Sequence, residues 1–516
     1  MTLLVAVWLA AGAGFIALSY EILWYRAFSF VSEGQASVFG LLLSFYLFGI
    51  ACGALLVRRG FSPAADVRRM ADPQGRWRWR LVLMLLAANL AAFLVIPALA
   101  RLASWNWYAG FLLVAIATAV MGAVFPVLSH YAIPPDDWAG SALSLIYVGN
   151  ILGSAAGSVL TGFVLLDRLS TQGVSVLLAG LGVVLAAVPA LLAARWRKPA
   201  LAGAVACFAL LGVTSGPLFD RLYERLLQKG RRGVRPPVTT VVENRHGVIA
   251  VEGDGRLYGG GAYDGAFNVS LDDDLNLIER AFAVAALHPH PADVLMVGLG
   301  SGSWAEVVSH LPGVEHLTVI EINPGYLSLL PRYPAVAGLV SNPKVHVEID
   351  DARRWLQRRP DARFDVIVMN TTWHWRAHAS SLLSKEFFEI ARAHLRPGGV
   401  HYLNATGSRE VERTAAEAFP FALRFLNMVA VSDAPLRFNR ERWRTVLTTP
   451  LPDGKTPVDL GSAGKETLER LLALPDAGLS IFGRPTMEER ASLIAESRGL
   501  RTVTDDNMAC EWKTRP

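Results

Sequence analysis

The sequence predicts two architectures in one chain: an α-helical transmembrane bundle, followed by an α/β domain with a small β region and a doubly wound, mainly parallel sheet. Long apolar runs fill the first 217 of the 516 residues, as is typical of membrane helices. From residue 293 to about residue 406, short apolar runs alternate with helical patterns. Such alternation is typical of a parallel sheet that helices cover on both faces.

The N-terminal part contains seven apolar runs, each long enough to cross a hydrocarbon core of about 30 Å. They lie near residues 2–24, 36–57, 81–100, 107–130, 140–166, 172–194 and 200–217. The N-terminus has no basic region and further runs follow it, so the first run is predicted to be a membrane helix rather than a cleaved signal peptide. Small residues such as Gly149, Gly153 and Gly157 predict closely packed helices.

Basic residues predict the orientation, because cytoplasmic loops carry an excess of Lys and Arg. Those after the second run place that loop and the N-terminus in the cytoplasm: Arg58, Arg59, Arg68, Arg69, Arg76, Arg78 and Arg80. If every later run crosses, the C-terminal domain lies outside. The basic residues after the seventh run argue for the inside: Arg221, Arg225, Lys229, Arg231, Arg232 and Arg235. Either the seventh run is re-entrant or interfacial, or one more crossing exists, and we place the C-terminal domain in the cytoplasm.

Charge and cysteine content indicate which kinds of partner the chain can bind. The net charge is +5 at pH 7, but much of the basic charge flanks apolar runs, which favours anionic lipid headgroups over nucleic acid. Cys52, Cys207 and Cys510 are far apart and form neither a metal-site spacing nor a disulfide framework. We therefore expect a lipid bilayer as partner, no nucleic acid and no metal. A homo-oligomer is compatible with the sequence.

The predicted domain organisation has four parts. Residues 1–217 form the transmembrane helical domain, and residues 218–237 form a basic connector. Residues 238–290 hold a small β region and a lead-in helix, since their first runs alternate between apolar and polar residues. Residues 291–516 form a Rossmann-like nucleoside-binding domain.

The α/β domain contains five strand candidates: Asp293–Val297, His316–Ile320, Lys344–Glu348, Asp365–Met369 and Gly399–Asn404. In such a sheet the ligand lies at the carboxyl ends of the strands. The residues that follow each candidate are therefore predicted to form the site. Residues 455–516 are polar and helix-leaning, with Thr504–Asn507 as the only motif.

A glycine turn follows the first strand candidate. Gly298, Gly300 and Gly302 allow the backbone to approach a ligand closely, and the helix after them offers free N–H groups. Glu321 ends the second strand candidate and suits a ribose diol. This arrangement predicts a nucleoside-binding site.

Polar residues also end the third and fourth strand candidates. Asp351 can accept a hydrogen bond from an adenine amino group, and Ala352 leaves room for the ring. Alternatively, Asp351 only caps the helix that follows. After the fourth candidate, His374 is the nearest residue whose type suits general-base work near neutral pH, and a structural role is the alternative.

These residues resemble the class I S-adenosylmethionine (SAM)-binding fold and, within it, the spermidine synthase (aminopropyltransferase) family. The likeness runs from about Gly247 to Asn404. Its motifs are Tyr263–Asn268, Asp273–Glu279, Phe364–Asn370 and Leu382–Phe388. The N-terminal half is similar to the membrane-fused branch of the family, through Tyr20–Trp24 and Gly149–Gly157, and so is the tail at Thr504–Asn507.

The resemblance implies SAM or decarboxylated SAM as cosubstrate. The residues that it implies for binding are Asn268, Gly298, Gly300, Ser301, Gly302, Glu321, Asp351, Ala352 and Thr371. The residues that we predict to act in catalysis are Asn370 and Glu279, at positions that the resemblance indicates, and His374, chosen for its residue type.

Several positions depart from the family pattern, including Leu277 and Ile278 in place of a Tyr-His pair. Ser301 stands where spermidine synthases carry an Asp that holds an amine and repels a carboxylate, so intact SAM becomes acceptable. Asn370 and Trp373 stand where the family has two acids that bind and deprotonate the attacking amine, and Asn cannot act as a general base. Trp373 and Trp375 form an aromatic wall beside the sulfonium, a hydrophobic lid or a membrane-facing contact.

We therefore expect an enzyme anchored in a bacterial inner membrane, with its catalytic domain in the cytoplasm. It is a transferase or lyase, similar to the enzymes of polyamine synthesis, that cleaves a SAM-type sulfonium and releases 5′-methylthioadenosine. Alkyl transfer to an acceptor and intramolecular attack by the carboxylate of SAM are both open. The alternatives are methyl transfer to a membrane-soluble acceptor, and a non-catalytic sensor or transporter that only binds a nucleoside.

Overall fold

The computed structural model describes residues 1–58, 76–192, 194–229, 236–370, 373–450, 457, 462–476 and 483–512. Thr371 and the arginines within 59–75 and 230–235 lie outside these described residues. The chain divides into two compact units. The helical unit comprises Met1–Glu33 and Ser37–Val248, and the α/β unit comprises Gly34–Ala36 and Ile249–Pro516.

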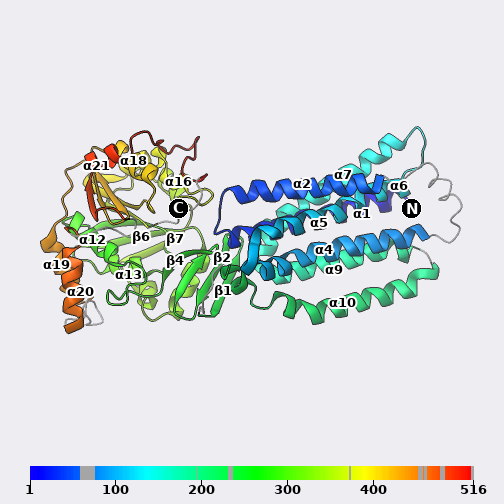
Figure 1. Cartoon of the computed structure of the whole chain (residues 1–516), viewed down its shortest axis with the longest axis horizontal. Helices are drawn as coiled ribbons and strands as arrows, with labels where there is room; N and C mark the ends of the chain where they lie inside the picture. The colour runs from blue at the N-terminus through cyan, green and yellow to red at the C-terminus, as the bar shows by residue number, and fades with distance from the viewer. Residues whose placement is uncertain are drawn as a thin grey trace. The chain divides into compact units, whose positions relative to one another are not determined.

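The helical unit consists mainly of long apolar helices (Figure 1). They are α1 (Leu3–Val31), α2 (Ser37–Arg58), α4 (Arg76–Asn106), α5 (Gly110–Gly122), α6 (Val124–Ala132), α7 (Ala139–Leu160), α9 (Thr171–Leu191) and α10 (Arg197–Phe219). Within the described residues, 6 helical stretches are long and apolar enough to cross a membrane. The longest, Arg78–Ala132, holds the third and fourth apolar runs, and its helices α4 and α5 pack against each other. The seventh run forms α10, a continuous helix of 23 residues.

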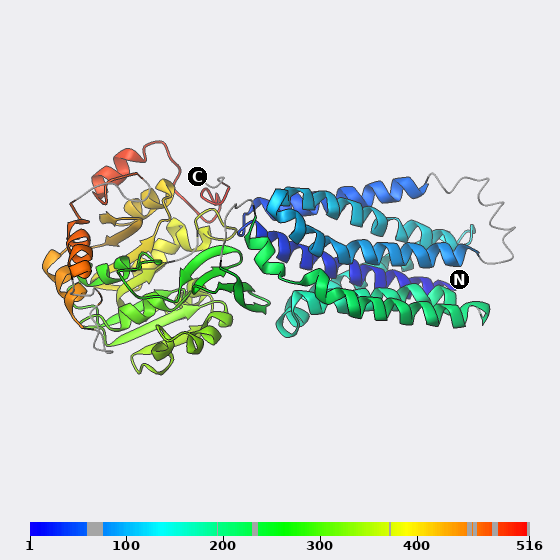
Figure 2. The ribbon, with the colours of Figure 1, turned by 60° about the horizontal axis from the view of Figure 1, so that its bottom comes forward.

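Small residues bring the helices of this unit close together, as the sequence predicted. Helix α7 packs along α1, and a Cβ added at Gly153 or Gly157 would collide with the α1 backbone at Ala11 or Phe15. At Gly149 it would come within 3.0 Å of the Val7 carbonyl oxygen. Without side chains at these points the two backbones approach more closely than larger residues allow. Figure 2 shows the long helices of this unit running side by side.

A partly buried carboxylate connects three segments of the helical unit. Glu243, in β1 (Val238–Asn244), accepts hydrogen bonds at Oε2 from the Thr171 N–H at 2.8 Å, the Thr171 hydroxyl at 2.6 Å and the Tyr223 hydroxyl at 2.7 Å. Arg26 of α1 approaches the same oxygen to 3.6 Å. These contacts compensate for the partial loss of water around the Glu243 charge.

A four-stranded antiparallel sheet precedes the main sheet, in the order β1-β2-β3-β4. Its other strands are β2 (Gly247–Glu252), β3 (Arg256–Gly259) and β4 (Ala262–Ala266). The division between the two units falls within β2. The turn after β4 leads to helix α12 (Glu279–Leu287), whose side chains are all buried.

The main sheet has eight strands in the order β12-β10-β11-β9-β8-β5-β6-β7. The five strand candidates from the sequence are confirmed as its parallel part: β5 (Asp293–Val297), β6 (His316–Glu321), β7 (Val345–Ile349), β8 (Phe364–Met369) and β9 (Leu395–Asn404). Three antiparallel strands that the sequence did not predict extend it: β10 (Phe421–Phe425), β11 (Met428–Ser432) and β12 (Met487–Glu489).

Helices cover both faces of the main sheet. Helix α12 packs against α13 (Ser303–Ser309) and α19 (Arg440–Thr448), whereas α17 (Lys385–Ala393) packs against α15 (Ala352–Gln357) and α18 (Arg409–Ala418). Alternate side chains of the central strands, such as Leu295 and Val297, join the α15, α17 and α18 layer in one hydrophobic core. The parallel strand order 3-2-1-4-5 with helices on both faces makes this a doubly wound sheet.

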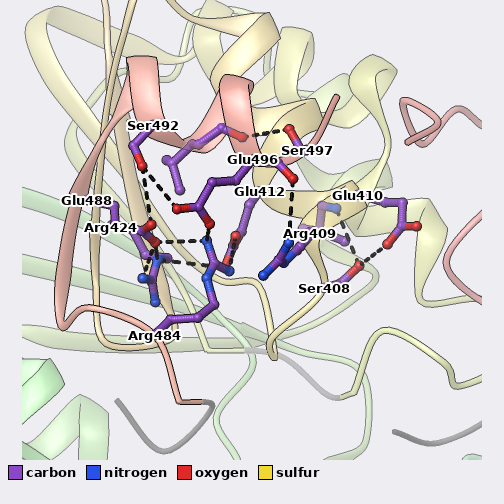
Figure 3. Close-up of polar contacts among 12 residues, drawn as sticks. Ser408, Arg409, Glu410, Glu412, Arg424, Arg484, Glu488, Ser492, Glu496 and Ser497 are labelled. Atoms are coloured by element: carbon purple, nitrogen blue, oxygen red, sulfur yellow. Dashed lines mark hydrogen bonds and ion pairs between the residues drawn. The ribbon is translucent and has the colours of Figure 1, made fainter. Parts of the chain in front are cut away.

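A buried ion-pair network holds the C-terminal segment against this sheet. In Figure 3, Arg424 of β10 and Arg484 point toward Glu488 of β12 and Glu412 of α18. Arg424 donates to Glu488 from Nε at 2.7 Å, and Arg484 donates to Glu412 at 2.6 Å and to Glu488 at 2.8 Å. The three-residue strand β12 is therefore held by charge pairing as well as by its backbone bonds.

Candidate active site

The glycine turn lies between β5 and α13, at the carboxyl edge of the sheet. Gly298, Gly300 and Gly302 have φ angles of 89°, 53° and 77°, which other residues rarely adopt. Gly302 caps α13, and a Cβ there would lie 2.7 Å from Leu330 Cδ2. At Gly298 an added Cβ would meet no atom of the described residues within 4 Å. The turn thus offers bare backbone to a ligand.

Glu321 lies beside this turn at the end of β6. It is 4% exposed, and its two carboxylate oxygens accept hydrogen bonds from the Leu299 N–H at 2.8 Å and the Asn323 N–H at 2.7 Å. Burial raises the pKa of Glu321 to about 7, and the nearby Asp264 charge adds to the rise, whereas the backbone hydrogen bonds oppose it. The carboxylate is therefore fixed in place and close to half-ionised at neutral pH.

Strand β4 brings a second acid to the turn. The Asp264 carbonyl oxygen would lie 3.1 Å from a Cβ at Gly300, so the β4 backbone passes directly against the glycine turn. The Tyr326 hydroxyl donates to the Asp264 carboxylate. Burial raises the pKa of Asp264, while the Tyr326 hydrogen bond and the Arg376 charge lower it. Gly259 makes room for this pair, because a Cβ there would lie 2.7 Å from Asp264 Oδ2.

Ser301 holds the turn against the β4 hairpin. Its hydroxyl contacts the Ser303 hydroxyl at 3.1 Å, and Ser303 donates to the Ala266 carbonyl oxygen at 2.7 Å. Asn276 continues the connection through its amide, which donates to the Ala266 and Asn268 carbonyl oxygens, both at 2.7 Å. These contacts place Ser301 at the site and make it part of the scaffold of the turn.

Asn268 is bonded within its own loop. Its amide donates to the Asp273 carbonyl oxygen at 2.7 Å and accepts from the Ser270 N–H at 2.7 Å. This gives Asn268 a loop-shaping role in the structure, and its contact with a cosubstrate stays a prediction.

The end of β7 carries the next two acids. Asp351 is the N-cap of α15 and accepts from the Arg354 N–H at 2.8 Å, which is the capping role considered from the sequence. Asp350 pairs with the Arg354 side chain, and this pairing lowers the pKa of Asp350. Ala352 is buried at the first position of α15. Contact of Asp351 and Ala352 with an adenine ring stays a prediction.

Asn370 follows β8 and belongs to a chain of amides. Its Oδ1 accepts from Asn404 Nδ2 at 2.9 Å, and Asn404 Oδ1 accepts from Asn427 Nδ2 at 3.0 Å. Asn427 Oδ1 in turn accepts from Arg280 at 2.8 Å. Sequence reasoning singled out only the first of these four residues, because the others come from distant segments and carry no shared motif.

His374 is buried on the same side of the sheet edge. Its backbone N–H donates to the Thr406 hydroxyl at 3.1 Å, and its ring Nδ1 lies 2.7 Å from that hydroxyl. Thr406 has a φ angle of 49°, a strained conformation that the loop after β9 imposes. Thr406 thus fixes the His374 ring, whose catalytic role stays a prediction.

Glu279 begins α12 and is 6% exposed. Burial raises its pKa well above the ordinary value, and the neighbouring Asp274 adds to the rise. Asp274 is itself held by the Asn276 and Ile278 N–H groups at 3.1 Å and 2.7 Å. Burial and the neighbouring Asp274 thus both stabilise the protonated form of Glu279 relative to the free side chain.

Aromatic residues and the tail surround this edge. The Trp373 and Trp375 rings stack with centroids 6.3 Å apart, and Trp375 is 2% exposed. Asp505 of the tail accepts from both Arg353 nitrogens of α15 at 2.8 Å and 2.5 Å, and from the Ser384 hydroxyl at 2.7 Å. The tail motif thus packs on the helix that follows β7.

The loop at residues 34–36 is also part of the α/β unit. The Gly34 carbonyl oxygen accepts from the Ala377 N–H at 2.8 Å, and Gln35 forms a bridge with Arg376.

Among the residues that the structure describes, no group of three His, Cys, Asp or Glu side chains could hold a metal ion.

Comparison with known proteins identifies the domain. Residues 281–422 match the spermine/spermidine synthase domain. A polyamine aminopropyltransferase of Mycobacterium tuberculosis is 24% identical over 437 residues, which cover 78% of this chain and 77% of that protein. Polyamine aminopropyltransferase 2 of Streptomyces coelicolor is 27% identical over 420 residues, covering 77% and 72%.

Two solved structures also align with part of the chain. A spermidine synthase in complex with the transition-state analogue AdoDATO aligns with 18% identity and a TM-score of 0.36, covering 46% of this chain and 86% of that one. The spermidine synthase of Thermotoga maritima aligns with 17% identity and a TM-score of 0.35. The family model and the named relatives confirm the resemblance inferred from the sequence: the chain carries a spermine/spermidine synthase domain.

Proposed function

We propose that the chain is a membrane-anchored enzyme whose α/β unit binds SAM or decarboxylated SAM and cleaves the sulfonium, with release of 5′-methylthioadenosine. The observation that carries this proposal is the meeting of the bare glycine turn with the buried Glu321 carboxylate at one sheet edge, inside a spermine/spermidine synthase domain. Gly298 leaves open space above the turn, so the residues present fit a nucleoside.

The protein's contribution to this chemistry is positioning. A sulfonium activates its own carbons, so a nucleophile forms the new bond while the carbon–sulfur bond breaks and its electron pair returns to sulfur. In this assignment Glu321 accepts hydrogen bonds from the ribose hydroxyls, and Asp351 accepts one from the adenine amino group. Holding the reacting atoms in line and excluding water supply the rate enhancement.

The departures from the family pattern shape the choice of cosubstrate. Ser301 is neutral and hydrogen-bonded within the turn, so it does not repel the carboxylate of intact SAM. We propose for this reason that intact SAM is accepted alongside decarboxylated SAM.

The long apolar helices support an anchoring role for the helical unit. We propose that it binds a lipid bilayer, the inner membrane in a bacterial cell, with the α/β unit in the cytoplasm where nucleoside cosubstrates are abundant. Fractionation of cells tests the anchor: the full chain is expected in the membrane pellet after alkaline carbonate washing. Recovery in the carbonate supernatant would contradict it.

Product analysis tests the reaction. The detergent-solubilised full chain is incubated with SAM or decarboxylated SAM, each with and without putrescine, and products are identified by mass spectrometry. We expect 5′-methylthioadenosine. S-adenosylhomocysteine would indicate methyl transfer instead, and binding without turnover would indicate a sensor, so either result would overturn the proposal.

A further inference from the structure

The amide chain that ends at Asn370 has a fixed direction. Arg280, Asn427 and Asn404 are 5%, 6% and 8% exposed, so the chain is buried almost to its end. Each link is between 2.8 Å and 3.0 Å long. A buried chain of this kind is rigid, because a broken link would leave a polar group without a partner.

Two groups that can only donate set the direction. The Arg280 guanidinium carries N–H donors and no acceptor atom of its own. Asn427 must therefore turn its Oδ1 toward Arg280 and its Nδ2 away from it. The Thr406 backbone N–H likewise donates to Asn404 Oδ1 at 2.8 Å. Asn404 must therefore turn Nδ2 toward Asn370.

The direction of the chain determines which end of the Asn370 amide is left without a partner in it. Its Oδ1 is used by Asn404, so its Nδ2, a group that can only donate, is left at the free end of the chain. Among the residues that the structure describes, no acceptor for this Nδ2 is recorded. Asn370 therefore offers hydrogen-bond donors at the tip of β8, although an isolated Asn could present either end.

Strand register places this donor next to the glycine turn. Met369 of β8 is paired with Val297 of β5, so Asn370 is level with Gly298. Neighbouring strands lie about 5 Å apart. The Asn370 amide is thus at the same sheet edge as Glu321, one strand away from the turn.

We propose that Asn370 is a specificity-determining residue that selects a carboxylate, and not an amine, as the nucleophile that attacks the sulfonium. This rests on the proposed function and deepens it. A carboxylate only accepts hydrogen bonds, so it matches the Asn370 donors, whereas a protonated amine only donates and meets another donor. The carboxylate is either that of SAM itself or that of a separate acid.

The chemistry balances without a base. One carboxylate oxygen forms a bond to the carbon next to sulfur, the carbon–sulfur bond breaks, and its electron pair goes to sulfur. The negative carboxylate and the positive sulfonium become a neutral ester or lactone and neutral 5′-methylthioadenosine, and no proton moves. An amine nucleophile would first have to give up a proton, and neither Asn370 nor Trp373 can take it.

The experiment compares nucleophiles in matched reactions of the full chain in detergent. Three substrates are used: SAM alone, decarboxylated SAM with adipate, and decarboxylated SAM with putrescine. Adipate and putrescine share a four-methylene spacer, so they differ in the reacting groups. We expect 5′-methylthioadenosine to form from SAM alone, or from decarboxylated SAM with adipate. Its release should be about 100-fold faster than from decarboxylated SAM with putrescine.

Asn370→Asp tests the residue itself. Asp keeps the link from Asn404 but replaces the donors by a negative oxygen, so the carboxylate reaction is expected to fall by about 100-fold and the putrescine reaction to rise. Asn342→Asp makes the same change at the opposite, amino-terminal edge of the sheet, before β7, and should leave the preference unchanged. Binding of 5′-methylthioadenosine, which has neither group, checks that each variant is folded.

If Asn370→Asp does not fold, Asn370→Ala removes the donors without adding charge and should slow the carboxylate reaction by about 10-fold. A wild-type preference for putrescine, or an unchanged preference in the variants, would overturn the selection by Asn370 and leave the proposed function standing. The absence of 5′-methylthioadenosine from all three reactions would overturn both.

Discussion

The ionisation of Glu321 links nucleoside binding to pH. Its pKa is raised to about 7, mainly because the carboxylate is buried. Ribose hydroxyls donate hydrogen bonds and favour the ionised acid, so binding is expected to lower this pKa and release a proton. We therefore expect nucleoside affinity to increase as the pH rises through 7.

The size of the effect follows from the pKa. At pH 6 about a tenth of the Glu321 side chains are ionised, and at pH 8 about nine tenths are, so the affinity should increase about tenfold over this range. Below pH 7 the same linkage predicts the release of nearly one proton for each nucleoside bound, about 0.9 at pH 6.

Calorimetry measures both quantities. 5′-Methylthioadenosine is the probe, because it has no group of its own that titrates between pH 6 and 8. Titration at pH 6 in two buffers of different ionisation enthalpy gives the number of protons released. Glu321→Gln should abolish the release, and Asp264→Asn should move the midpoint to lower pH because the Asp264 charge raises the pKa of Glu321. Equal affinity at pH 6 and pH 8 in the wild type would show that nucleoside binding is not linked to the ionisation of Glu321.

The same group affects the ligand-free protein in the opposite direction. Because the folded-state pKa of Glu321 lies above its ordinary value of 4.5, the folded state holds the proton more tightly than the unfolded chain. Its contribution to stability is fully present below pH 4.5 and is lost as the pH rises through 7. The difference amounts to about 3 kcal/mol of unfolding free energy.

Three further substitutions test the scaffold. Gly302→Ala places a Cβ at a positive φ and 2.7 Å from Leu330 Cδ2, so it should lower the unfolding free energy in urea by about 1–3 kcal/mol. The control Gly338→Ala, at an open position, should lower it by less than about 1 kcal/mol. Equal losses would show that the Gly302 backbone is not strained by a side chain. Arg424→Met leaves two buried carboxylates with fewer partners and should cost about 3–5 kcal/mol. Its control, Arg440→Met, removes a solvent-exposed ion pair and should change the unfolding free energy far less, because exposed pairs contribute little to stability. Similar losses in the two variants would refute the importance of the buried network. Glu279→Gln should gain thermal stability relative to the wild type as the pH rises from 5 to 9, because it removes a buried acid with a raised pKa; an unchanged difference would show that Glu279 stays charged in the folded protein.

The parallel strands could be predicted because their sequences are self-contained. Strands β5, β6, β8 and β9 each contain a short apolar run that is mostly buried, and the edge strand β7 alternates apolar and polar residues. Each pattern can be recognised without its partner strand, and the glycine turn identifies the edge that carries the site. Strands β10 to β12 were not predicted. β12 has three residues, two of them Glu, and it is a strand because it pairs with β10 and is held by Arg424.

The role of a site residue could be predicted only where its neighbours in the sequence indicate that role. The roles of Glu321 and Gly302 follow from the strand and the turn that directly precede them. The capping role of Asp351 follows from the helix that begins directly after it. The orientation of Asn370 is different, because it depends on Arg280, whose guanidinium reaches Asn427 across 147 positions of the chain. No local pattern encodes such a contact, and only the folded sheet brings these residues together.

A single time course measures sulfonium cleavage at the Glu321 edge of the α/β unit. The wild-type chain and Glu321→Ala are incubated in detergent with SAM alone, with decarboxylated SAM and adipate, and with decarboxylated SAM and putrescine, and 5′-methylthioadenosine is quantified by mass spectrometry. The wild type should release it steadily, and Glu321→Ala should release it at least about 10-fold more slowly because the ribose contact is lost. Equal release by the two proteins, or none by the wild type, would contradict the account.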